Sequence, residues 1–152
     1  MAPPQWRPGQ AGTPMFETVV VGGTDSDGAE LAFRRALELT RAAGGTLHIV
    51  SALGDEHDGP PPDLPDEFRH TAVGAGRTEW HLYQLRVRAE SAQVRVETHA
   101  VLARPADAIT KVVADQDADL VVVGTGSRHG TRQLSGVPKA VMDRVSCAVL
   151  VV

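Results

Sequence analysis

The chain has 152 residues, 42% of them hydrophobic and 22% charged, which is the size and balance of one globular domain. Its formal net charge of -4 excludes the broad positive field that nonspecific nucleic-acid binding needs. The single cysteine, Cys147, excludes an internal disulfide and a multi-cysteine zinc site, and no apolar run approaches the roughly 20 residues of a membrane helix. We therefore expect a cytoplasmic protein that contacts neither nucleic acid nor membrane.

Two proline clusters indicate the segments outside the core. Residues 1–15 hold four of the ten prolines and no apolar stretch of the secretory type, so we expect a disordered tail before a domain at 16–152. This leaves open whether the native start is Met1 or Met15. Residues 54–67 hold four more prolines and six acidic side chains, which predicts a solvated acidic loop or, alternatively, a docking site for another protein.

From Phe16 onward the chain alternates between strand and helix patterns. Thr18 to Gly22 is typical of a short buried strand, and a helix is predicted from Asp27 to the glycine pair at 44–45. Asp27 and Glu30 have the spacing of a capping box. Thr46 to Ser51 is a second predicted strand. A weaker helix follows the acidic loop, and its stripe of Trp80, Tyr83 and Val87 is expected to face the core.

The second half continues the alternation. Val94 to Val101 alternates apolar and polar residues like a strand near a sheet edge, whereas Leu120 to Val123 is uninterrupted and predicts burial on both faces. Two helices are predicted at Pro105 and at Pro138, the first with an apolar stripe and the second ending at Val145. A last strand is expected at Cys147 to Val152, where Cys147 is interpreted as a small buried hydrophobe. The stripe of the first helix comprises Ala108, Ile109, Val112 and Val113.

This alternation predicts one doubly wound α/β domain, a parallel sheet with helices on both faces. Such sheets bind ligands outside the carboxyl ends of their strands, at the point where the winding reverses. The candidate site therefore comprises the loops after the first, second and fourth strands.

The loop after the fourth strand, from Gly124 to Gly136, is the richest in glycine. It predicts either a phosphate-binding cradle or a plain glycine-rich turn. The dinucleotide motif fails at His129, the P-loop pattern fails after Gly136, and Ser127 lacks the glycines of a nucleophile elbow. We expect no catalytic residue, and no metal site either, because His57 lies in an acidic loop without fixed geometry.

Several segments resemble the universal stress protein family. The opening Val19-Val20-Val21-Gly22-Gly23-Thr24-Asp25-Ser26 is similar to the start of that family. The segment from Ala118 to Gly124, the glycine and serine loop, Val137-Pro138 and the final Cys147 to Val152 resemble its characteristic last third. The resemblance covers about residues 16–152, except for the stretch from 54 to 87.

The resemblance implies a five-stranded parallel sheet of the adenine nucleotide alpha hydrolase-like type and a homodimer formed through the last strand. In one branch of the family it also implies ATP, bound with Mg²⁺. The nucleoside aspartate matches Asp25 with a gap and Thr24 without one, and Val50 lies at the end of the second strand. Gly124 matches the first glycine of the family's phosphate loop. The other loop positions are Gly126 or Gly130, then Ser135, Gly136 and Val137.

This loop departs from the family pattern in length and in order. Gly124 to Gly136 spans 13 residues where the pattern spans 15, and the closing pair is Ser135-Gly136 rather than glycine followed by serine. Two functions therefore remain open. One is a dimeric stress regulator that binds ATP, with at most slow hydrolysis; the other is a nucleotide-free dimer that engages another protein. For the first, we expect Gly124→Val to abolish nucleotide binding while leaving the fold intact.

Overall fold

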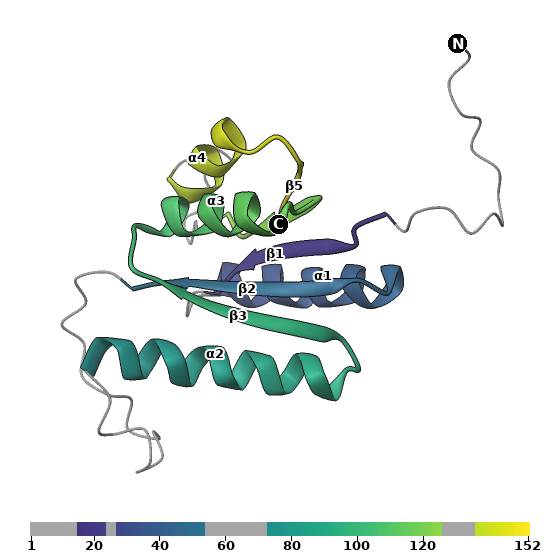
Figure 1. The fold of residues 1–152 in the computed structure, drawn as a ribbon, viewed down its shortest axis with the longest axis horizontal. Helices are drawn as coiled ribbons and strands as arrows, with labels where there is room; N and C mark the ends of the chain where they lie inside the picture. The colour runs from purple at the N-terminus through teal and green to yellow at the C-terminus, as the bar shows by residue number, and fades with distance from the viewer. Residues whose placement is uncertain (1–14, 24–26, 54–72, 126–135) are drawn as a thin grey trace, which may run out of the picture.

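The computed structural model of the chain describes residues 15–23, 27–53, 73–125 and 136–152 (Figure 1). Strands and helices alternate throughout, as the sequence predicts. The elements are β1 (Thr18–Gly22), α1 (Asp27–Ala43), β2 (Thr46–Ala52), α2 (Val73–Ser91), β3 (Arg95–Val101), α3 (Pro105–Gln116), β4 (Leu120–Val123), α4 (Val137–Arg144) and β5 (Ala148–Val151). Among the described residues, no helix is long and apolar enough to cross a membrane.

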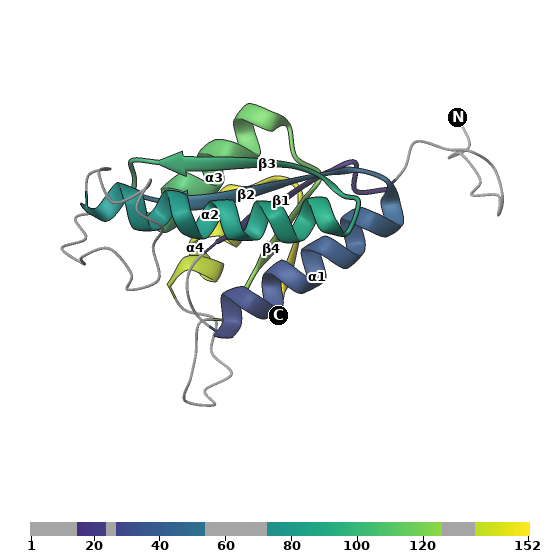
Figure 2. The ribbon, with the colours of Figure 1, turned by 90° about the horizontal axis from the view of Figure 1, so that it is seen from below.

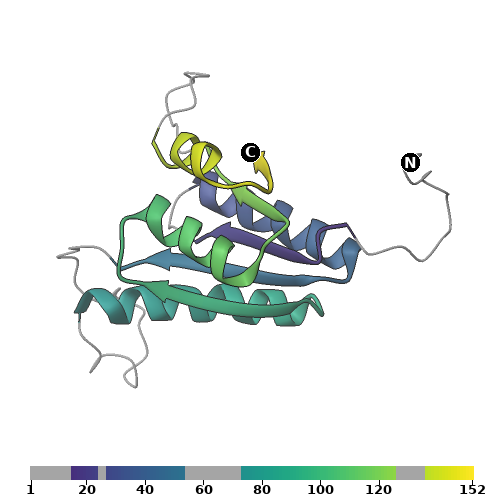
Figure 3. The ribbon, with the colours of Figure 1, turned by 45° about the horizontal axis from the view of Figure 1, so that its top comes forward.

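The five strands form one parallel sheet in the order β3-β2-β1-β4-β5. The chain adds β2 and β3 on one side of β1, then returns to add β4 and β5 on the other. Helices α1 and α2 cover one face of the sheet, and α3 and α4 cover the opposite face (Figures 2 and 3). The predicted doubly wound α/β fold is thereby confirmed.

Two hydrophobic clusters hold the helices to the sheet, because successive side chains of each central strand point to opposite faces. Val19 and Val21 of β1 pack with Phe33 of α1 and Leu85 of α2, whereas Val20 packs with the α3 side. All four residues of β4 are buried, as its uninterrupted apolar run predicts. The predicted stripe of α3 is buried as well.

The expected core stripe of α2 is wrong at Tyr83 and Val87, whereas Trp80 is half-buried. Tyr83 is 49% exposed and Val87 is 41% exposed, while Leu82, Leu85 and Ala89 are buried. Both stripes have the spacing i, i+3, i+7, and they differ by two residues, or about 200° around the helix. Periodicity therefore cannot choose between the two faces.

Glu30, the acidic member of the predicted capping box, binds α2, while the side chain of Asp27 lies outside the described residues. Both carboxylate oxygens of Glu30 accept hydrogen bonds from Arg88 of α2, at 2.6 and 2.9 Å. The Arg88 guanidinium in turn lies 4.7 Å from the ring centroid of Phe33. These contacts join the two helices on this face of the sheet.

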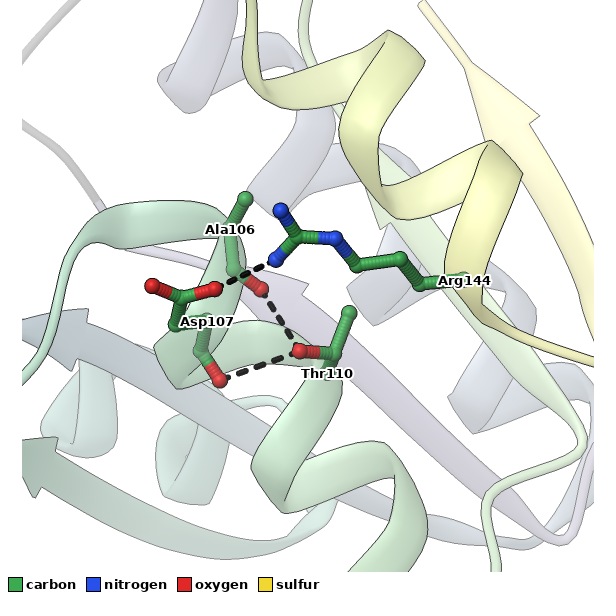
Figure 4. Close-up of polar contacts among 4 residues, drawn as sticks. All are labelled: Ala106, Asp107, Thr110 and Arg144. Atoms are coloured by element: carbon green, nitrogen blue, oxygen red, sulfur yellow. Dashed lines mark hydrogen bonds and ion pairs between the residues drawn. The ribbon is translucent and has the colours of Figure 1, made fainter.

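On the opposite face an ion pair joins α4 to α3. Arg144, the last residue of α4, donates a hydrogen bond to the carboxylate of Asp107 in the first turn of α3 (Figure 4). Thr110 Oγ1, one turn further along, donates to the carbonyl oxygen of Ala106 at 2.9 Å. The ion pair lies at the end of α4, and the start of this helix directly follows the loop predicted to bind phosphate.

Candidate functional site

The candidate site lies where the winding of the sheet reverses, between β1 and β4. The chain leaves β1 toward α1 on one face, while the helix that follows β4 lies on the other face. Loops that diverge in this way leave an opening outside the carboxyl ends of the two strands. The site predicted from the sequence lies at these strand ends.

The end of β1 is fixed against the end of β2. The Gly23 amide donates to the carbonyl oxygen of Val50 at 2.6 Å, and the Ser51 hydroxyl donates to the carbonyl oxygen of Gly23. A Cβ at position 23 would lie 3.0 Å from Cγ2 of Ile49, so the strand exit is closely packed. Ser51 was not among the predicted site residues, because a polar residue at the end of an apolar strand is by itself a weak indication of a functional role.

The backbone leaving β4 touches the first turn of α1. A Cβ at position 124 would lie 2.5 Å from the carbonyl oxygen of Gly28 and 2.6 Å from its carbonyl carbon. Only glycine allows this approach, so the expectation that Gly124→Val leaves the fold intact is not supported. The first backbone amides of a helix have no partner within the helix and attract anions. The contact with Gly28 thus brings the start of the predicted phosphate loop to such a set of amides.

The same loop is held at both of its described ends. Thr125 donates its amide to the carbonyl oxygen of Val152 at 2.8 Å, and Val152 donates to Val123 at 3.0 Å, so the pairing of β4 with the terminal strand extends past β4. At the other end, Gly136 has φ 68° and ψ -129°, a conformation essentially restricted to glycine. Pro138 then lies within the first turn of α4 and is buried.

Of the predicted site residues, Val50, Gly124, Gly136 and Val137 lie within the described ranges. Thr24, Asp25, Gly126, Gly130 and Ser135 lie outside them. Val50 lies in β2 and Gly124 directly follows β4, and both strands pair with β1. Val50 and Val137 belong to the same hydrophobic cluster. The structure therefore brings the described members to one edge of the sheet.

Cys147 is half-buried rather than fully buried, and it packs against the cluster on the α3 side. Burial raises the pKa of its thiol above the usual 9.0, which disfavours the reactive thiolate. The interpretation as a small hydrophobe is consistent with this position.

The sequence profile of the universal stress protein family matches residues 15–152, nearly the whole chain. The chain belongs to the universal stress protein family. Universal stress proteins from two strains of Mycobacterium tuberculosis are each 31% identical to it over 141 residues, which is 90% of this chain and 96% of theirs.

Solved structures of universal stress proteins share the fold. One, a universal stress protein in complex with cAMP, superposes with a TM-score of 0.70 at 28% identity, covering 91% of this chain and 97% of that protein. UspA from Lactobacillus plantarum superposes with a TM-score of 0.71 at 19% identity, covering 90% and 97%. The family assignment from the sequence is therefore confirmed, and with it the nucleotide alpha hydrolase-like fold of this universal stress protein.

Proposed function

We propose that this universal stress protein binds an adenine nucleotide at the carboxyl ends of β1 and β4 and acts as a stress-response regulator. The observation that carries the proposal is the backbone contact between Gly124 and Gly28, which joins the glycine loop to the N-terminus of α1. Backbone amides from a glycine-rich loop and a helix start are the usual protein partners of phosphate groups. The cAMP complex of a 28% identical relative with the same fold supports an adenine nucleotide.

In this proposal the two parts of the nucleotide contact different residues. Val50 and the residues at 24–25 border the nucleoside, and the loop from Gly124 to Gly136 surrounds the phosphates. Gly136 is suited to this role because a Cβ there would meet no atom of the described residues within 4 Å. Bound Mg²⁺ would neutralise phosphate charge if the ligand is ATP.

The first test is to identify what the full-length protein binds. The purified chain is denatured, and the released small molecules are separated by anion exchange. Protein freed of ligand is then titrated calorimetrically with ATP and Mg²⁺, with AMP and with cAMP. Saturable binding of any of the three in the micromolar range supports the proposal, and the order of affinities identifies the ligand. A folded protein that binds none of them overturns it.

A pair of aspartate variants locates the site. Asp25→Ala is expected to weaken nucleotide binding by at least tenfold. The matched control is Asp143→Ala, because Asp143 is exposed near the far end of α4. Equal affinity in the two variants would contradict the assignment of Asp25.

We further propose that two copies pair through β5. The strand lies at the edge of the sheet and contains only Ala148, Val149, Leu150 and Val151, with no charge or proline to prevent pairing with another chain. Its residues are at least partly exposed. If the nucleotide proposal fails, this edge favours the alternative function, a nucleotide-free dimer that engages another protein.

A further inference from the structure

A cluster of three potential metal ligands lies on strands β2 and β3, outside the candidate nucleotide site at the carboxyl ends of β1 and β4. These strands pair in register, with His48 opposite Glu97 and Val50 opposite His99. Glu97 and His99 are two residues apart and so share one face of the sheet, and His48 shares a face with Val50. Because Val50 packs on the side of α3, all three side chains lie on that face.

Their ligand atoms are close together. His48 Nδ1 lies 2.9 Å from His99 Nε2 and 3.4 Å from Glu97 Oε2, and the three ligand atoms all lie within 4.8 Å of one another. The two imidazole rings are stacked, with centroids 5.2 Å apart and planes inclined by 28°. Two nitrogens bound tetrahedrally to Zn²⁺ at about 2.0–2.1 Å lie about 3.3 Å apart. Small rotations of the two rings would therefore make room for the ion.

The cluster runs from the interior to solvent. The His48 side chain is 5% exposed, whereas that of Glu97 is 60% exposed, so an ion can reach the inner ligand past the outer one. Burial lowers the pKa of His48 and of His99, while Glu97 beside both rings acts in the opposite direction, as does Asp115 of α3 on His99. Neutral imidazole is the form that binds metal.

We propose that Nδ1 of His48, Nε2 of His99 and a carboxylate oxygen of Glu97 form a Zn²⁺ site. Two imidazoles and one carboxylate are a ligand set that zinc accepts, and a fourth position stays open for water or another ligand. The ion would bridge β2 to β3, the edge strand. The proposal does not depend on the nucleotide, although His48 lies two residues before Val50 on the same strand.

The test uses the full-length chain without a polyhistidine tag, stripped with a chelator and titrated with ZnCl₂ by calorimetry in a non-coordinating buffer without nucleotide. One ion per chain is expected, together with a rise in melting temperature. Replacing Zn²⁺ by Co²⁺ should give the visible absorption of a tetrahedral site. No saturable binding by the folded wild-type chain overturns the proposal and leaves a hydrogen-bonded imidazole pair.

Three variants identify the ligands. His99→Gln should lower the Zn²⁺ affinity by more than about 100-fold, because even partners that only orient a ligand contribute about 10- to 100-fold. Glu97→Gln should lower it less and should change the Co²⁺ spectrum. His57→Gln is the control, since His57 lies among acidic residues in the sequence outside the cluster. All three variants must retain the circular dichroism spectrum of the wild type. Loss of binding in His57→Gln, or its retention in His99→Gln, would assign the ion elsewhere.

Discussion

Gly124, where the chain leaves β4, lies directly against the backbone of Gly28 in the first turn of α1. A Cβ at position 124 would stand 2.5 Å from the Gly28 carbonyl oxygen, closer than any side chain tolerates. The obstacle is backbone, which cannot rotate away as a side chain can. This glycine is therefore required by the packing of α1 on the sheet.

Gly124→Ala should consequently destabilise the protein by about 1–3 kcal/mol, the usual cost of overpacking. Gly22→Ala is the matched comparison, because the described atoms nearest to its Cβ would belong to the Ile109 side chain, with the terminal methyl at 3.0 Å. That methyl can move, so a change within about 1 kcal/mol is expected. Urea unfolding of both variants measures the difference. Equal stability of the two variants would mean that the backbone at Gly28 can shift to accommodate a Cβ at position 124 at little cost in free energy.

A second prediction concerns the pair of Glu30 and Arg88, which joins α1 to α2. Arg88→Ala should cost about 1 kcal/mol, because it removes a bidentate ion pair and the contact with the Phe33 ring. Among the described residues, Arg86→Ala on the same helix loses the exposed pair with Glu90, worth about 0.3–0.5 kcal/mol. A smaller loss for Arg88→Ala than for Arg86→Ala in urea unfolding would contradict this ranking.

The Glu30 pair should also make stability depend on pH. The hydrogen bonds from Arg88 lower the pKa of Glu30 below the usual 4.5. The folded state favours the ionised form of Glu30 more than the unfolded state does. The contribution of this pair to the free energy of unfolding is therefore complete above pH 4.5, and it is lost as the pH falls through the lower pKa of the folded state. Glu30→Gln should therefore be less stable than the wild type at pH 7 and equally stable at pH values below the folded pKa of Glu30. A difference in stability between Glu30→Gln and the wild type that stays the same at low pH would show that the ionised Glu30 carboxylate is not its cause.

Cys147 should react slowly with thiol reagents. Burial raises the pKa of its thiol, so the thiolate fraction near neutral pH is lower than in a free cysteine. The reaction with a disulfide reagent such as DTNB should be slower in the folded protein than in urea. It should also accelerate at a higher pH. Equal rates in the two states would show that Cys147 is accessible in the folded chain.

The sequence predicted those features that depend on neighbouring residues. The buried run of β4, the stripe of α3 and the start of α4 near Pro138 are local patterns, and all three are confirmed. The exposed side of α2 was predicted wrongly because two stripes of equal spacing compete, and only contact with the sheet selects Leu82 and Leu85. The helix lies over the edge of the sheet, where only one narrow stripe is covered.

Contacts between distant residues could not be predicted in this way. His48 and His99 are 51 positions apart, and Glu30 and Arg88 are 58 apart. Their proximity depends on the register of β2 with β3 and on the packing of α1 beside α2. A histidine within the apolar run of β2 was the one local signal of the His48 cluster. At the candidate nucleotide site, Gly124 was identified from its place after a strand, whereas its partner Gly28 required the structure.

The proposed pairing through β5 can be tested without disturbing the sheet. The amide of Val152 points to β4, where it donates to Val123 at 3.0 Å. Successive amides of a strand point in opposite directions, so those of Val151 and Val149 point away from β4, toward a second chain. Val149→Pro should therefore abolish the dimer while leaving a folded monomer, because proline removes an outward amide.

Leu150→Pro is the control for this last experiment, since it removes an amide that points to β4 and should destabilise the fold itself. Light scattering coupled to size exclusion measures the mass of each variant, and circular dichroism measures its folding. A folded Val149→Pro variant that remains dimeric would place the interface elsewhere. A wild-type chain that is monomeric at micromolar concentration would remove the interface altogether, and the exposed edge would then be free for a partner of a different kind.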